Sequence, residues 1–145
     1  MNLLFDSSVW IEDLRHGALR FILPRVRGRY FLWIDSIAAA ELLAGCGTRR
    51  HRRIVERLLS PFERAGRVVT PGHRDYHRAG NALSSLRASG LPLRNPGGAL
   101  LDAVQAADAA RIGALLVTAN PSDFRKLARH IPVKVQPFDE FGRDL

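Results

Sequence analysis

The sequence has a single cysteine and no long hydrophobic run, and each shortage excludes a class of protein. Cys46 has no second cysteine with which to form an internal disulfide bond. The first residues lack the basic start, apolar middle and small-residue cleavage site of a secretion signal. No uninterrupted apolar stretch approaches the roughly 18 to 20 residues that a membrane-spanning helix needs. We therefore expect a cytoplasmic protein with no membrane segment.

Lysine is also scarce, yet the chain is strongly basic because arginine takes its place. Lysine and arginine number 22 against 14 aspartates and glutamates, and only Lys126 and Lys134 are lysines. The formal charge is +8 and the sequence pI is about 11.1, above the value of about 9 that favours a polyanionic partner. Because a genome rich in G and C also produces arginine-rich chains, composition favours RNA or DNA binding without establishing it.

The histidines form no recognisable metal motif. His73 and His77 have the i, i+4 spacing of a helical zinc pair, but neither an HExxH sequence nor a cysteine partner accompanies them. We interpret all the histidines as surface residues: His16, His51, His73, His77 and His130.

Short, nearly continuous apolar runs alternate with helical stretches along the chain. Such strands are typical of a parallel sheet covered on both faces, so the alternation predicts an α/β fold. A length of 145 residues suits one domain, residues 1–145, with only the tail 139–145 loosely held. The predicted strands are residues 2–5, 31–34, 68–69, 114–118 and 133–135. The predicted helices are residues 36–46, 48–62, 73–88 (capped by Thr70) and 99–111 (after a turn at 95–98).

Three acidic residues interrupt apolar runs. They are Asp6 in "LLFDSSV", Glu41 in "IAAAELLAG" and Asp102 in "GALLDAVQAA". Each has an ordinary structural explanation. Asp6 would cap a helix that begins at Ser7 or Ser8. Glu41 would be a helix former that faces solvent, and Asp102 would complement a helix dipole.

The positions of these acids along the chain favour a shared site. Asp6 ends the first strand, Glu41 lies in the helix after the second, and Asp102 opens the helix before the fourth. The carboxyl ends of parallel strands share one edge, where ligands bind. Two unit charges about 4 Å apart interact by roughly 4 kcal/mol at an effective dielectric near 20, so clustered carboxylates take up protons or hold a cation. Oxygen-only ligands favour Mg²⁺ or Mn²⁺.

The segment "LLVTANPSDF" adds polar groups at the end of the fourth strand. Asn120, Pro121 and Asp123 fit a helix start with a cap, a proline in the first turn and an acid three residues after the cap. Capping alone explains both polar residues. Alternatively, Asp123 supplies a metal-ligating or water-orienting oxygen at the same edge of the sheet.

These four segments, in this order, resemble the PIN-domain ribonucleases, specifically the VapC-type toxins of bacterial toxin–antitoxin pairs, from residue 2 to about residue 137. By this resemblance Asp6, Glu41 and Asp102 match the three principal acidic ligands. Ser8 matches the small hydroxyl or amide residue that follows the first acid. Asn120 is a departure, because many family members carry a fourth acid at its position while the Asp123–Phe124 pair is kept.

The resemblance implies a PIN-like three-layer fold, with a parallel sheet of about five short strands between helices. It implies Mg²⁺- or Mn²⁺-dependent cleavage of RNA to a 5′-phosphate and a 3′-hydroxyl, with Asp6, Glu41, Asp102 and Asp123 as catalytic residues. Ser8 and Asn120 would support these acids. It also implies a homodimer, inhibited by an antitoxin whose extended segment lies along a groove at residues 42–46 and 54–62.

Two groups of basic residues are candidates for binding RNA phosphates, although each also fits a solvated helix face. They are Arg49, Arg50, Arg52 and Arg53 in the first group, and Arg125 and Lys126 in the second.

Two rival functions remain. Because of Asn120, the chain would alternatively be a catalytically inactive PIN-like module that binds RNA or a protein partner. Aspartyl-phosphate phosphatases also place an aspartate after a first strand, but they need a second one at the position of Ser8. Receiver domains need an acidic pair before that aspartate, which is absent here.

Overall fold

The structure is a computed structural model that describes residues 1–94 and 96–145. Its centre is a five-stranded sheet with the strand order β3-β2-β1-β4-β5, in which every neighbouring pair is parallel. The parallel sheet confirms the predicted α/β class. The strands are β1 (Asn2–Phe5), β2 (Phe31–Asp35), β3 (Val68–Val69), β4 (Leu115–Thr118) and β5 (Lys134–Pro137).

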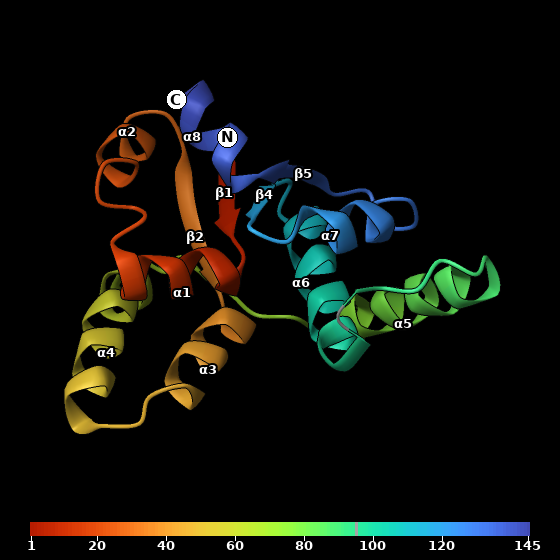
Figure 1. Ribbon diagram of the computed structural model, residues 1–145, viewed down its shortest axis with the longest axis horizontal. Coiled ribbons are helices and arrows are strands. Elements are labelled where there is room, and N and C mark those ends of the chain that lie inside the picture. Colours follow the sequence, from red (N-terminus) through yellow and green to blue (C-terminus); the bar gives the residue numbers. More distant parts are fainter. Residues whose placement is uncertain (95) are drawn as a thin grey trace.

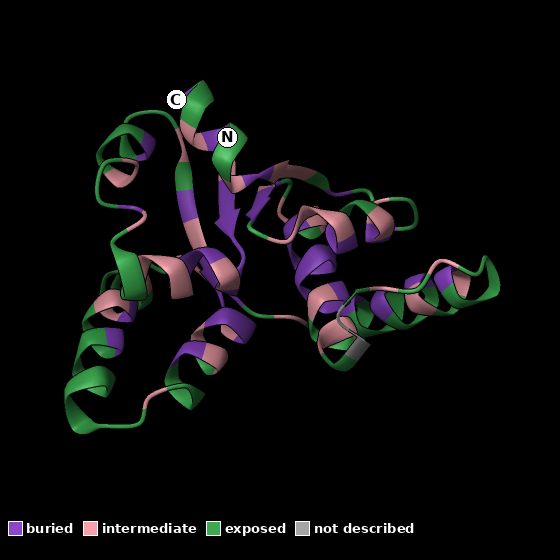
Figure 2. Ribbon diagram, in the orientation of Figure 1, coloured by how far each residue is buried: buried purple, intermediate pink, exposed green. Residues whose placement is uncertain are grey.

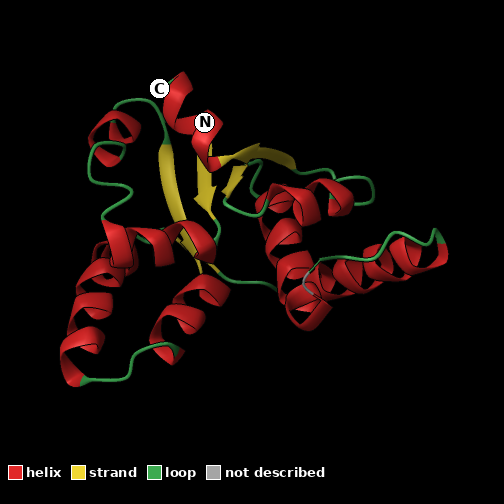
Figure 3. Cartoon of the chain, viewed as in Figure 1, coloured by secondary structure: helices red, strands yellow, loops and turns green. Residues whose placement is uncertain are grey.

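Helices cover both sides of the sheet and complete the three layers (Figures 1 and 3). In the view of Figure 1, α2 and α4 lie to the left of the sheet, α1 and α3 lie at and below its lower end, and α5 to α7 lie to the right. None of the described helices is long and apolar enough to cross a lipid bilayer. The helices are α1 (Ser7–His16), α2 (Leu23–Arg27), α3 (Ser36–Ala44), α4 (Arg49–Arg64), α5 (His73–Ala88), α6 (Ala99–Arg111), α7 (Pro121–Leu127) and α8 (Phe138–Asp144).

Two hydrophobic cores follow from the alternation of side chains along the strands. In β1, Leu4 joins the cluster formed with α5, α6 and α7, whereas Leu3 and Phe5 join the cluster formed with α1 to α4 and α8. Figure 2 accordingly shows β1 and β4 as buried. Because both faces of the strands are covered, their sequences are continuously apolar, which is the pattern the sequence presents.

The C-terminal tail differs from the sequence-based expectation. Residues 139–145 were expected to be loosely held, but they belong to α8 and its end, with Phe141 and Leu145 buried. The Phe141 ring lies 5.8 Å from that of Phe5 and 5.6 Å from that of Tyr30. Burial of this tail could not be predicted locally, because charged residues surround Phe141 in the sequence and its apolar partners are distant along the chain.

The start of α5 also differs from the prediction. Gly72, not Thr70, is the N-cap, and its N–H donates to Asp75 Oδ2 at 2.9 Å. Thr70 instead shares a 2.7 Å hydrogen bond with Ser36. Asn95, the first residue of the predicted 95–98 turn, lies outside the described residues, and Pro96–Gly98 forms a short 3-10 helix before α6.

Strand order determines where a ligand site is expected. The chain runs outward from β1 through β2 to β3, then returns to place β4 and β5 on the other side of β1. The order therefore reverses between β1 and β4. In open parallel sheets, ligands bind in the crevice beyond the carboxyl ends of the strands at such a reversal.

Candidate active site

Asp6 lies at this reversal, immediately after β1, and only 3% of its surface is exposed. Its Oδ2 accepts hydrogen bonds from Ser8 Oγ at 2.6 Å and Thr118 Oγ1 at 2.8 Å, and its Oδ1 accepts one from Ser7 Oγ at 3.2 Å. Although Asp6 precedes α1, its side chain forms no capping hydrogen bond. The carboxylate is held by hydroxyl groups, and its oxygens keep lone pairs for a further ligand.

The two hydroxyls that hold Asp6 are themselves fixed by backbone groups. Ser8 Oγ accepts from the N–H of Ala119 at 3.2 Å, and Thr118 Oγ1 accepts from the N–H of Asn120 at 2.9 Å. Each hydroxyl is thereby oriented to donate to Asp6. Thr118 was not identified from the sequence, because a threonine that ends a strand is ordinary until the neighbouring strand is known.

Asp102 lies near three other acidic residues. Its pKa is raised to about 7, mainly by burial and then, in decreasing order, by the nearby carboxylates of Asp6, Glu41 and Asp123. Asp102 comes from the first turn of α6, Glu41 from α3 and Asp123 from α7. The structure therefore brings Asp6, Glu41 and Asp123 within electrostatic reach of Asp102 at the carboxyl edge of the sheet.

Asp123 is fully buried and its oxygens have local partners. Its Oδ1 accepts from the N–H of Arg94 at 2.7 Å, and its Oδ2 accepts from Asn120 Nδ2 at 3.3 Å. Asn120 is the N-cap residue of α7, as predicted, but its side chain forms no capping bond to the helix backbone. Asp123 therefore connects the start of α7 to the segment that precedes α6.

Asp35 belongs to the same region and was missed. It ends β2, is fully buried, and accepts a 2.6 Å hydrogen bond from the N–H of Ala38 as the cap of α3. Its pKa is raised to about 7, mainly by burial and with smaller contributions from the carboxylates of Asp108 and Asp6, against the lowering effect of hydrogen bonds from Ala38 and Gln105. A signal was present, since "LWIDSIA" repeats the arrangement of "LLFDSSV".

The chemistry of these donors fits a divalent cation. Among the described residues, no three acidic, histidine or cysteine side chains are close enough together to form a complete metal site. The donors are nevertheless all oxygens, the set that Mg²⁺ and Mn²⁺ prefer. The raised pKa of Asp102 reflects burial first and then repulsion by the neighbouring carboxylates, and a cation would relieve that repulsion. The carboxylates of Asp6, Glu41 and Asp102 are therefore donors of the type that a divalent cation prefers.

The two predicted basic groups differ in their surroundings. Arg49, Arg50 and Arg53 are exposed at the start of α4, where Arg52 pairs with Glu56 at 3.2 Å. Arg125 is exposed on α7. The ammonium of Lys126 donates to the carbonyl of Pro92 at 2.7 Å, which gives this lysine a structural contact.

An apolar pocket of about 350 Å³ lies among α1, α3 and α4. Ile11 and Leu14 of α1 face Leu42 of α3 and Ile54 of α4 across it. Glu41 also lines this pocket, so one of the clustered acids is accessible from an apolar surface.

Comparison with known proteins identifies the fold. The model of the PIN domain family matches residues 3–130. VapBC-1 from nontypeable Haemophilus influenzae superposes with a TM-score of 0.71 at 20% identity, covering 96% of this chain and 99% of that chain. VapBC2 from Rickettsia felis, bound to a DNA fragment from its promoter, superposes with a TM-score of 0.69 at 19% identity, covering 94% of this chain and 98% of that chain. FitAcB from Neisseria gonorrhoeae superposes with a TM-score of 0.67 at 19% identity, covering 92% of this chain and 95% of that chain. A comparison with curated proteins gives no match.

Proposed function

Because the chain belongs to the PIN-domain family, we propose that it is a Mg²⁺- or Mn²⁺-dependent endoribonuclease that acts as the toxin of a toxin–antitoxin pair. The observation that carries the proposal is the gathering of Asp6, Glu41 and Asp123 around Asp102 at the strand-order reversal. A carboxyl group whose pKa is raised to about 7 by burial and by neighbouring acids is costly unless it serves a site. The net charge of +8 supports a polyanionic substrate.

In this proposal Asp6, Glu41 and Asp102 hold the cation. Held by these residues, a divalent cation would supply an activated water molecule and would stabilise the leaving oxygen of a phosphoryl displacement. Ser8 and Thr118 fix the Asp6 carboxylate, as outer partners of metal ligands do. Asp102 gives up its proton when the cation binds, so cation affinity rises with pH.

We assign Asp123 and Asn120 supporting roles in this scheme. Asp123 accepts hydrogen bonds from Arg94 and Asn120, which position it beside Asp102. Its negative charge then strengthens the attraction of the site for a cation without direct coordination. Asn120, whose amide is directed to Asp123, orients this acid and the end of β4.

The apolar pocket supports an antitoxin partner. An inserted apolar side chain would fill the space among Ile11, Leu42 and Ile54. A basic side chain beside it would reach Glu41 and displace the cation electrostatically. The arginines at the start of α4 lie beyond this pocket and would contact RNA phosphates or an acidic partner segment. We also expect a homodimer, which sedimentation of the purified chain would test.

Cleavage of RNA by an Asp6→Asn variant tests the activity. We expect the loss of Mg²⁺-dependent cleavage by at least about 100-fold, because the variant loses a ligand charge worth several kcal/mol to the reaction. Asp139→Asn is the matched control, since it makes the same chemical change on the exposed surface of α8. Both variants should unfold at a urea concentration close to that at which the parent unfolds. Full cleavage by Asp6→Asn would defeat the proposal.

The inactive alternative rests on Asn120 and predicts a different result. A module that only binds RNA or a protein would gain no thermal stability from Mn²⁺ through Asp6, Glu41 or Asp102. The proposed nuclease should be stabilised by Mn²⁺, and its Asp6→Asn variant should lose most of that stabilisation. Equal shifts in the melting temperature of parent and variant would favour the inactive module.

A further inference from the structure

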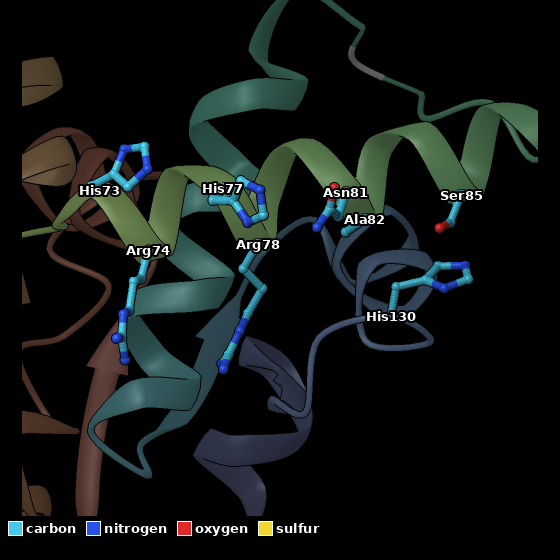
Figure 4. A pocket seen from close by; sticks show the side chains of 8 residues that line it. All are labelled: His73, Arg74, His77, Arg78, Asn81, Ala82, Ser85 and His130. Carbon is cyan, nitrogen blue, oxygen red and sulfur yellow. The ribbon is translucent and has the colours of Figure 1, made fainter.

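A second pocket, of about 630 Å³, lies along α5 (Figure 4) and shares no lining residue with the apolar pocket or the clustered acids. One face of α5 forms it, from His73 to Ser85, and His130 closes one end from the turn after α7. The α5 face spans about 18 Å at 1.5 Å per residue. We call this surface the α5 groove. From the sequence alone, its histidines are predicted only to lie at the surface.

The α5 groove is basic and its cations are not neutralised. Arg74 and Arg78 stand one helical turn apart, and Figure 4 shows their side chains extending in the same direction. Both are exposed, and neither forms an ion pair with any carboxylate in the described ranges. No acidic residue is among the described residues that line the groove. By contrast, the arginine-lined surface of α4 includes Glu56, which pairs with Arg52.

The remaining lining groups suit a nucleic acid strand better than a protein surface. His73 and His77 present rings with centroids 6.2 Å apart and tilted by 34°, and both residues are exposed. Imidazole rings are surfaces on which unpaired bases stack. Asn81 and Ser85 supply hydrogen-bonding groups. No large apolar side chain lines the groove in the described part of the chain, so it lacks the anchor that a protein interface needs.

The groove is also close enough to the acidic site to contact the same molecule. α7 begins beside Asn120 at the acidic site and runs for seven residues, or about 10 Å, towards the turn that carries His130. α5 packs against α7. A flexible strand that leaves the acids along α7 would reach the groove within a few nucleotides.

We propose that the α5 groove binds single-stranded RNA, with Arg74 and Arg78 on consecutive phosphates and the histidines against bases. The inference rests on the proposed nuclease function in one respect only, the identity of the polyanion. The groove is then a second contact that retains the RNA while the acidic site acts on a neighbouring bond. It makes affinity depend on the length of the RNA.

The test measures binding of labelled single-stranded oligouridylates of about 20 and about 5 nucleotides by the full chain. All proteins carry Asp6→Asn so that the RNA stays intact. Arg74→Ala/Arg78→Ala should weaken binding of the longer RNA more than that of the shorter one. For this variant, the slope of the logarithm of the RNA-binding constant against the logarithm of the salt concentration should be smaller in magnitude by about 1.4. Each phosphate contact on a single strand contributes about 0.7 to that slope, and the variant loses two contacts.

Arg25→Ala/Arg29→Ala is the matched control. It removes the same charge from exposed positions at α2, on the other side of the sheet. Its salt slope should stay that of the parent, as should the slope of Arg74→Lys/Arg78→Lys, which keeps both charges. Urea melts establish that every variant is folded.

Several results would overturn the proposal. Equal slopes for the groove variant and its control would do so, and so would a parent that binds neither RNA. A groove variant that loses affinity for a protein partner but not for RNA would identify the groove as a protein-binding surface instead. Cleavage by the parent with Asp6 intact is measured separately. If the parent cleaves RNA and the groove variant binds RNA as the control does, the groove proposal is wrong and the proposed nuclease function still stands.

Discussion

Thr118 Oγ1 lies 2.8 Å from Asp6 Oδ2, and this hydrogen bond joins the ends of β4 and β1. The two residues are 112 positions apart in the sequence and meet because the strand order reverses between their strands. The same hydroxyl accepts from the N–H of Asn120. One threonine therefore sets both the direction of the Asp6 carboxylate and the start of the segment that leads to Asp123.

Replacing Thr118 by valine should reduce RNA cleavage by about 10- to 100-fold, the usual effect of losing an outer partner of a metal ligand. Stability should fall by about 1 to 2 kcal/mol, because the buried Asp6 oxygen and the Asn120 N–H lose a partner. Thr118→Ser keeps the hydroxyl and is the control. Single-turnover cleavage and urea unfolding measure the two effects, and a valine variant with the activity of the serine variant would contradict the assigned role.

Removing the charge of Asp102 should separate stability from function. Asp102→Asn relieves the repulsion by Asp6, Glu41 and Asp123 that raises the pKa of this carboxyl. At pH 8 without metal, we expect a higher melting temperature than that of the parent. Added Mn²⁺ should stabilise the parent but not the variant. A variant that is less stable than the parent without metal would show that Asp102 is not under electrostatic strain.

The free energy of unfolding should fall as pH rises from about 4 to about 7 in the absence of metal. The pKa of Asp35 is raised from 3.8 to about 7, mainly by burial, so in this window the folded state holds a proton that the unfolded chain releases. The raised pKa values of Asp102, about 7, and Asp108, about 6, act in the same direction. The total loss should be roughly 2 to 4 kcal/mol, discounted because Asp102 is partly exposed.

Asp35→Asn should flatten this pH profile while keeping an oxygen to cap α3 through Ala38. Asp139→Asn, on the exposed surface, should leave the profile unchanged. Urea unfolding at several pH values measures both. A profile that keeps its full slope in Asp35→Asn would assign the effect to other groups.

Asp123→Ala should reveal whether this acid positions the site or binds the cation. Loss of the acceptor for Arg94 N–H and Asn120 Nδ2 should destabilise the fold by about 1 to 3 kcal/mol. If the acid only positions the site, Mn²⁺ should still raise the melting temperature of the variant. Loss of the Mn²⁺ effect, as complete as in Asp102→Asn, would instead make Asp123 a ligand.

Much of the fold could be predicted because it depends on local patterns. The helices at His73–Ala88 and Ala99–Arg111 and the strand at Val68–Val69 have the predicted bounds. Thr48 caps α4 by accepting from the N–H of His51, as an N-cap threonine does. The α8 helix was missed because Phe141 is buried by distant partners. The α5 cap was missed because Thr70 instead bonds Ser36, the first residue of α3.

The residues of the candidate site also fall into those that the sequence could identify and those that it could not. Asp6, Glu41 and Asp102 could be selected because each interrupts an apolar run, and the parallel sheet then explains why they meet. Asp35 carried the same signal and was overlooked. Thr118 could not have been selected, because its role depends on the adjacency of β1 and β4, which only the strand order defines.

α7 holds the segment at residues 91–94 at two points, through Lys126 Nζ to the Pro92 carbonyl and through Asp123 to the Arg94 N–H. That segment precedes the helix that carries Asp102. Opening of α7 would release both attachments together, so amides of the segment and of the first turn of α6 should exchange with solvent as one unit. Through these two side-chain contacts, a short helix thereby makes Asp102 either fully in place or released together with the whole segment.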